Sequence, residues 1–405
     1  MELTVGSLVV VALVAVTAPL LARGIGRWIA IPLVVFEILL GLALGPSGLG
    51  WITEGPLLDA LSEFGLAMLF FLAGNEVDFR AIRGRPIKRS VLGWLISLAL
   101  GIALATLLSP SFSTAVFIGI ALTSTALGTI MPVLRDAGEL RSAFGVGVVA
   151  VGAVGEFGPL LAISLFLGGR EPGLALVVII VFAVVAGAAI WLAAIGVGRR
   201  FHAIIAATLH SSSQFAVRLV LFILIALVAL SVMLGLDMLL GAFTAGVLGR
   251  LLLQGAPEKD AEFVESKLEA VGFGFLVPIF FISTGVTFDL DALVSDARTL
   301  ALVPIFLVLL LVVRGLPSML SAPPGATGRD RTSLALFGAT GLPIIVAVTA
   351  IGVDAGEVAA GTAAALVGAG MLSVLIFPLV ALLIRRPTAT AKPSPDDDVF
   401  VPVEG

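Results

Sequence analysis

Apolar runs follow one another along almost the whole chain, separated by short stretches that hold most of the charged residues. Each run is about 17–25 residues long, the length an α-helix needs to cross the hydrocarbon core of a bilayer. The pattern therefore predicts an all-α, polytopic membrane protein with thirteen spans. They lie at about 5–22, 29–46, 57–75, 90–109, 112–134, 142–168, 173–197, 213–234, 237–253, 270–287, 299–321, 331–352 and 357–384.

The basic residues support this count. Nineteen of the 23 Lys and Arg residues fall in alternate connections, starting with the first, and the exceptions are Arg170, Arg218, Arg298 and Arg314. Loops rich in Lys and Arg are typical of the cytoplasmic side, and a missed helix would exchange the two sides downstream. We therefore expect a multi-pass protein of the cell membrane, with its N-terminus outside and its C-terminus in the cytoplasm.

The composition narrows the possible functions. Of the 405 residues, 59% are hydrophobic and 12% are charged, roughly half the charged fraction of a soluble protein. The absence of Cys excludes disulfides and thiol chemistry, and the two His residues lack metal-ligand spacing. No basic tract points to nucleic acid. After a transmembrane domain over residues 1–386, the Pro- and Asp-rich residues 387–405 are predicted to form a disordered cytoplasmic tail.

Two spans end alike, which suggests an internal repeat. Each has Phe-Phe, then Gly, then Asp four residues later: Phe70, Phe71, Gly74 and Asp78 in one, and Phe280, Phe281, Gly285 and Asp289 in the other. The copies lie seven spans apart, so they cross the membrane in opposite directions. Inverted repeats of this kind are frequent in secondary transporters. A chance match between two apolar helix ends is the alternative.

The spans at 112–134 and 331–352 have hydroxyls, glycine and proline in mid-membrane. The residues are Thr123, Ser124, Thr125, Gly128 and Pro132 in the first, and Thr340, Gly341 and Pro343 in the second. Such positions favour interrupted helices, whose free carbonyls and half-helix ends can bind or screen a charge. The alternative is a pair of kinked helices whose hydroxyls bond to their own backbone.

Glu156 lies in the middle of the span at 142–168. A carboxylate at that depth is expensive unless it faces a cavity, a partner or a bound ion. It can be neutralised by a proton or by an alkali cation, but not by both at once, and this competition is the minimal requirement of cation/proton exchange. Arg314, in the opposite repeat, is a candidate to compensate its charge. A buried Glu–Arg ion pair that braces the two repeats is the structural alternative.

Several segments resemble the monovalent cation:proton antiporter-2 family, the Kef-type Na⁺/H⁺ or K⁺/H⁺ antiporters. They are residues 37–46, 70–78, 121–126, 241–246, 278–285 and 314–315. The resemblance implies a Na⁺/H⁺ antiporter-like fold in a homodimer, with a core that slides against a dimerisation scaffold. The expected core is about 57–168 and 270–384, and the expected scaffold is about 5–46 and 173–253.

The expected function is antiport of Na⁺ or K⁺ against H⁺, one for one, with no cofactor besides the transported ions. Glu156, Thr123, Ser124 and Thr125 are the candidate ion and proton ligands, Arg314 the compensating charge, and Thr340 and Gly341 the second break. Relatives usually place an amide and then Asp where this chain has Gly155 and Glu156. A non-coupled channel-like protein or sensor, and a transporter of organic solutes, stay open. An enzyme is not expected, because the spans hold no paired carboxylates, Ser–Lys or Ser–His arrangement or metal cluster.

Overall fold

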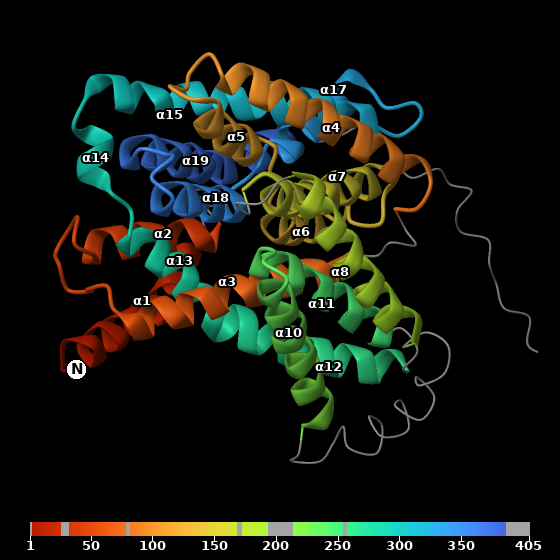
Figure 1. Ribbon diagram of the computed structural model, residues 1–405, viewed down its shortest axis with the longest axis horizontal. Coiled ribbons are helices and arrows are strands. Elements are labelled where there is room, and N and C mark those ends of the chain that lie inside the picture. The colour runs from red at the N-terminus through yellow and green to blue at the C-terminus, as the bar shows by residue number, and fades with distance from the viewer. Residues whose placement is uncertain are drawn as a thin grey trace, which may run out of the picture.

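The computed structural model describes residues 2–25, 32–77, 82–167, 172–192, 214–253 and 257–385. Within them the chain forms helices joined by turns, without a β-strand, which confirms the predicted all-α class (Figure 1). The predicted disordered tail lies outside the described residues. The helices are α1 (Glu2–Ile25), α2 (Leu33–Leu44), α3 (Pro56–Glu76), α4 (Arg85–Ala105), α5 (Phe112–Leu122), α6 (Leu127–Asp136), α7 (Ala143–Ala162), α8 (Pro172–Leu192), α10 (Phe215–Met233), α11 (Met238–Leu253), α12 (Glu258–Val271), α13 (Val277–Val286), α14 (Leu290–Val294), α15 (Ala297–Leu309), α16 (Leu316–Ser318), α17 (Gly328–Gly338), α18 (Pro343–Asp354) and α19 (Ala360–Arg385).

The apolar helices reproduce the predicted runs. Among the described residues, ten helical segments are long and apolar enough to cross a membrane, and three shorter apolar helices lie at 33–44, 173–188 and 238–253. Taken together, these segments coincide one for one with the thirteen predicted runs. The chain is therefore a multi-pass membrane protein. That the three shorter helices also cross, and the side on which each terminus lies, stay predictions.

Two helices are interrupted where the sequence predicts it. One breaks over residues 123–126, between α5 and α6, and the other over residues 339–342, between α17 and α18. The broken helices run in opposite directions. The Thr114 hydroxyl near the start of α5 donates to the Glu357 carbonyl after α18, over 2.8 Å. At the other end, Arg385 pairs with Glu139 after α6 and with Asp330 at the start of α17. This antiparallel arrangement is the one that an inverted repeat requires.

Glycines explain the repeated Phe-Phe-Gly motif. A Cβ at Gly74 of α3 would overlap the Phe243 carbonyl of α11, and a Cβ at Gly285 of α13 would overlap the Ile38 carbonyl of α2. Only glycine permits backbones to approach this closely. Because α2 and α11 also lie seven runs apart, the two crossings are equivalent under the repeat. The motif therefore has a packing role.

The helices gather in two groups in Figure 1, with α4–α7, α15 and α17–α19 in the upper half and α1–α3 with α10–α13 in the lower half. The predicted division puts residues 57–75 and 270–287, which include most of α3 and all of α13, in the core. Both glycine crossings would then lie across the boundary between core and scaffold. Sliding of these two units would require the crossings to break. The division stays a prediction.

Candidate functional site

Glu156 lies on α7 with 4% of its surface exposed. Its Oε1 accepts a hydrogen bond of 2.8 Å from the backbone N–H of Leu127, the first residue of α6. A helix start has free N–H groups and a partial positive charge, which favour an anion there. Its Oε2 is also buried and has no hydrogen-bond partner among the described residues. One carboxylate oxygen is therefore held by the break, and the other is available.

Small residues on α7 bring the break close to this carboxylate. The Gly155 carbonyl accepts a hydrogen bond of 3.0 Å from the Thr125 N–H, inside the break. A Cβ at Gly155 would overlap the Thr125 side chain and would lie 2.6 Å from Nη2 of Arg314. The glycine before Glu156 thus leaves space that the guanidinium and the threonine occupy.

The three hydroxyls predicted as ligands face different ways, although all are buried. Thr123 donates to the Ile120 carbonyl and Ser124 to the Ala121 carbonyl, both over 2.8 Å, so these two bond to their own helix. Thr125 instead donates to the Gly338 carbonyl at the end of α17, over 2.6 Å. Of the three, Thr125 is the one that meets a charged side chain, because its Oγ1 also accepts from Arg314.

Arg314 is completely buried and faces the same break. Its Nε donates to Thr125 Oγ1 over 2.8 Å, and its Nη2 donates to the Val151 carbonyl of α7 over 2.7 Å. Its Nη1 is buried without a hydrogen-bond partner in the described part of the chain. Among the ion pairs of these residues, defined by N–O distances up to 4.0 Å, none joins Arg314 to Glu156. The structure therefore does not contain the direct bracing pair.

A local widening of the helix positions Arg314. Residues Leu310–Gly315 form π-helical turns, in which the Leu316 N–H bonds to the Leu311 carbonyl five residues back. Pro317 follows and has no N–H to offer the preceding turn. The Ser318 hydroxyl donates to the Arg314 carbonyl over 2.7 Å. The proline and the serine together explain how a membrane helix tolerates irregular backbone at this point.

The second break has neutral partners. The Thr340 hydroxyl donates to the Leu336 carbonyl of its own helix, over 3.0 Å. The Ser373 hydroxyl of α19 bonds both the N–H and the carbonyl of Gly341, each over 3.1 Å. The Thr340 carbonyl accepts from the Ala126 N–H over 2.7 Å. The two breaks therefore touch, and the groups bound to the second are uncharged.

Asn75 and Glu76, at the end of α3, are polar residues that the sequence did not single out. Asn75 Oδ1 and Glu76 Oε2 are both buried without a hydrogen-bond partner in the described chain. Polar residues at the end of an apolar run are usual, so the sequence gives no sign that these oxygens of Asn75 and Glu76 are buried.

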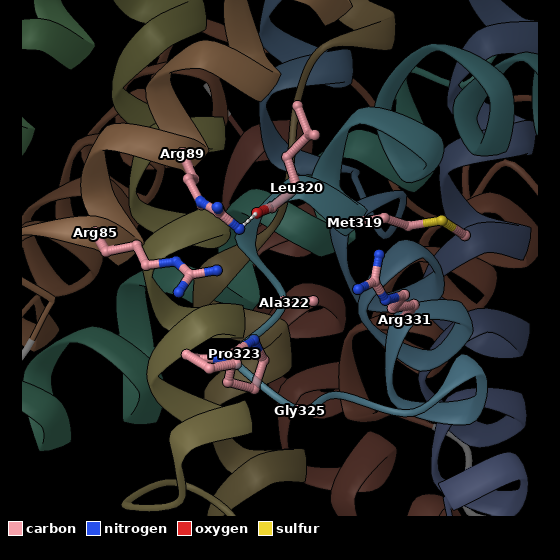
Figure 2. Close-up of a pocket in the computed structure, with 9 residues that line it drawn as sticks. Arg85, Arg89, Met319, Leu320, Ala322, Pro323, Gly325 and Arg331 are labelled. Carbon is pink, nitrogen blue, oxygen red and sulfur yellow. Dashed lines mark hydrogen bonds between the residues drawn. The ribbon is translucent and has the colours of Figure 1, made fainter.

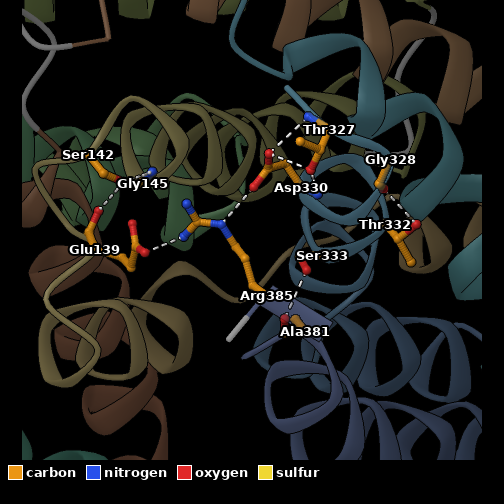
Figure 3. Close-up of polar contacts among 10 residues, drawn as sticks. All are labelled: Glu139, Ser142, Gly145, Thr327, Gly328, Asp330, Thr332, Ser333, Ala381 and Arg385. Carbon is orange, nitrogen blue, oxygen red and sulfur yellow. Dashed lines mark hydrogen bonds and ion pairs between the residues drawn. The ribbon is translucent and has the colours of Figure 1, made fainter. Parts of the chain in front are cut away.

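A second group that the sequence did not reveal joins the two broken helices at one end, as Figure 3 shows. Arg385 of α19 pairs with Glu139 Oε1 at 2.5 Å and with Asp330 Oδ1 at 2.9 Å, and it stacks over the Phe144 ring at 3.8 Å. Partial burial alone would raise the pKa of Glu139. The hydrogen bonds from Arg385 and Ser142 and the charge of Arg385 outweigh burial and hold that pKa below its usual 4.5. We call Arg385, Glu139 and Asp330 the clamp.

Comparisons with known proteins agree with this architecture. The transmembrane model of the sodium/hydrogen exchanger family matches residues 10–382. YjbQ of Bacillus subtilis is 32% identical over 337 residues, which cover 78% of this chain and 53% of YjbQ, so the chain spans about half of that relative. The Na⁺/H⁺–K⁺ antiporter GerN of Bacillus cereus is 24% identical over 372 residues, 89% of this chain and 88% of GerN. The sodium proton antiporter MjNhaP1 of Methanocaldococcus jannaschii superposes with a TM-score of 0.67 at 17% identity, over 95% of this chain and 96% of MjNhaP1. This likeness confirms the predicted fold.

Proposed function

The chain belongs to the transmembrane sodium/hydrogen exchanger family, a family of transporters, and from this premise we propose that it exchanges Na⁺ or K⁺ for H⁺. Relatives such as GerN, an Na⁺/H⁺–K⁺ antiporter, support the proposal. Resemblance to Kef-type antiporters supports it as well, in the segments Glu37–Pro46, Phe70–Asp78 and Ala121–Ala126.

The state of Glu156 is the observation that carries the proposal. A buried carboxylate with one unsatisfied oxygen is costly as a bare charge. Arg314 does not pair with it, and the Nε and Nη2 of Arg314 bond instead to Thr125 and to the Val151 carbonyl. A proton or a small cation at Oε2 would therefore supply the missing compensation, and the two would compete for the same oxygen. Arg314 instead holds the break in shape through these two bonds.

One carboxylate implies one cation per proton, so turnover is electroneutral. Alternating access requires Glu156 to face each side of the membrane in turn. The Thr125 N–H bond to Gly155 ties the broken helices to α7, so that they would move with Glu156 as one body. In the proposed homodimer, the scaffold at about 5–46 and 173–253 is the unit against which this body moves.

Proteoliposomes loaded with a pH-sensitive dye test the proposal. A jump in external Na⁺ or K⁺ is expected to drive proton movement in wild type. Clamping the membrane potential should leave the rate unchanged. In Glu156→Gln, which keeps the shape of the side chain and removes its charge, exchange should fall to the level of protein-free liposomes.

Glu37→Gln is the matched control. Glu37 is another buried carboxylate, 3% exposed, on α2 rather than at the break, and its variant should still exchange. Wild-type exchange by Glu156→Gln would remove that residue from the mechanism. Cation flux without proton movement would instead identify a channel-like protein.

A further inference from the structure

A cavity of about 230 Å³ lies between α4 and the segment that joins α16 to α17 (Figure 2). Three arginines line it, Arg85 and Arg89 from α4 and Arg331 from α17, and the walls between them include Leu320 and Pro323. Figure 2 shows Arg85 and Arg89 on one side of the Pro323 segment and Arg331 on the other. Helices from both repeats thus contribute to one cationic cavity, and its lining residues are not those of the Glu156 site.

Among the described residues, no carboxylate forms an ion pair with any of these three arginines. All three are exposed, and the ion pairs of the described residues involve Arg250 and Arg385 instead. Arg89 Nη1 donates to the Leu320 carbonyl over 3.2 Å, which holds the side chain beside the cavity while its other N–H groups stay available. Three like charges around one small cavity repel one another. An oxyanion that accepts several N–H bonds relieves this repulsion, and guanidinium groups suit phosphate geometry.

An exposed apolar surface continues from the cavity. Leu92 and Ile96 follow Arg85 and Arg89 at the three- and four-residue spacing that places side chains on one face of a helix. These two residues are 53% and 42% exposed. On the other side, Leu316 and Leu320 are four residues apart and are 53% and 39% exposed. The cationic cavity therefore borders an apolar face that runs along membrane-spanning helices.

We propose that this cavity binds the phosphate group of an anionic membrane phospholipid, whose acyl chains lie along Leu92, Ile96 and Leu316. A soluble phosphate would use the arginines but not the apolar face, and a zwitterionic lipid would use the apolar face with less benefit from the arginines. Basic pockets between membrane helices at the cytoplasmic end suit anionic headgroups, and the predicted topology puts all three arginines at that end. A lipid held here joins α4 of the first repeat to α17 of the second.

Native mass spectrometry of the purified protein in detergent tests this without reference to transport. The probes are dioctanoyl phosphatidylglycerol, dioctanoyl phosphatidylcholine and inorganic phosphate. One variant removes the three cavity charges, Arg85→Gln, Arg89→Gln and Arg331→Gln. Its matched control removes three charges from exposed neighbours that do not line the cavity, Arg83→Gln, Lys88→Gln and Arg329→Gln.

Wild type should bind phosphatidylglycerol more tightly than the other two probes. The cavity variant should bind it about tenfold more weakly, and the control should stay close to wild type. Equal weakening in both variants would reduce the effect to general surface charge and overturn the proposal. Phosphatidylcholine bound as tightly as phosphatidylglycerol would overturn the role of the arginines. Inorganic phosphate bound as tightly would make the ligand a free anion rather than a lipid.

Discussion

The breaks at 123–126 and 339–342 occupy equivalent places in the repeat, but different groups satisfy them. Glu156 and Arg314 bind the first, through the Leu127 N–H and the Thr125 hydroxyl, and each keeps one buried polar atom without a partner in the described residues. Ser373 binds the second through a hydroxyl that both donates and accepts. The repeat thus provides the same backbone shape twice, and the charges are concentrated on one copy.

The second break also supports the first. The Thr340 carbonyl accepts from the Ala126 N–H, and the Gly338 carbonyl accepts from the Thr125 hydroxyl. Gly338 is the last residue of α17 and Thr340 lies in the second break, so both acceptors are backbone groups. These neutral backbone acceptors help the charged break keep its shape while it keeps unsatisfied atoms. Under the proposed function, the first break is therefore the working half and the second break the supporting half.

Arg314 binds the first break and Ser373 binds the second. Removing each of these side chains tests the separation and should give the largest difference in stability. Arg314→Ala leaves a cavity and deprives Thr125 and the Val151 carbonyl of their donor, so we expect a loss of about 3 kcal/mol or more in unfolding free energy. Ser373→Ala removes one neutral hydroxyl and should cost about 1 kcal/mol. Thermal unfolding in detergent measures both.

The same pair should differ in transport. Arg314→Ala is expected to lose exchange in proteoliposomes, because the break that holds Glu156 is no longer ordered, and Ser373→Ala should retain most of it. Equal losses of stability and exchange in the two variants would contradict the division into a working and a supporting half.

A smaller effect is expected from filling the space beside Glu156. In Gly155→Ala the new Cβ overlaps the Thr125 side chain and crowds Arg314 Nη2, and overpacking of this kind costs about 1–3 kcal/mol. Gly128→Ala is the matched control at the same break, since its Cβ would meet Leu69 Cδ1 at 3.8 Å, an ordinary contact. It should be neutral or slightly stabilising.

The exchange rates of the two glycine variants give a second measurement of the same effect. Gly155→Ala should slow exchange by displacing Arg314 from the break, whereas Gly128→Ala should not. If Gly155→Ala were as stable and as active as wild type, the guanidinium would not be confined by the glycine. A side chain at position 155 would then fit without any movement of Arg314.

The periodic pattern was sufficient for the fold, and isolated charges in apolar runs were sufficient to propose a centre for the candidate site. Glu156 and Arg314 stood out because each interrupts an apolar run, and the breaks stood out because Gly, Pro and hydroxyls cluster there. The orientation of the hydroxyls could not be predicted. Thr125 differs from Thr123 because the Gly338 carbonyl, 213 residues away in the chain, lies opposite it. Such a contact is decided by packing between repeats, which local sequence does not encode.

The partners of charged residues at the ends of apolar runs could not be predicted from the sequence either. The sequence pattern indicates only ordinary residues of cytoplasmic connections for Arg385, Glu139 and Asp330. It indicates only the end of a repeated motif for Glu76. At a helix end, the local sequence does not distinguish a charged residue that is buried from one that is exposed. Whether such a group meets a partner depends on which helix ends meet, as they do where α6, α17 and α19 come together in the clamp.

The smallest predicted effect concerns the clamp, which joins the two broken helices at one end. Glu139→Gln should cost up to about 1 kcal/mol, because the Arg385–Glu139 pair is partly exposed and Arg385 keeps Asp330. The folded-state pKa of Glu139 lies below 4.5, so the pair stabilises the fold above the unfolded-state pKa. This stability is lost as the pH falls through the folded-state pKa.

The stability difference between wild type and Glu139→Gln should therefore be constant at neutral pH and shrink only below about 4.5. A double-mutant cycle with Arg385→Gln isolates the pair from the Asp330 contact. It follows that the clamp stays formed throughout the neutral range, so Glu139→Gln should leave the pH profile of exchange unchanged. A profile that shifted in this variant would make the clamp part of the pH response, and the supporting half would then do more than hold the first break in shape.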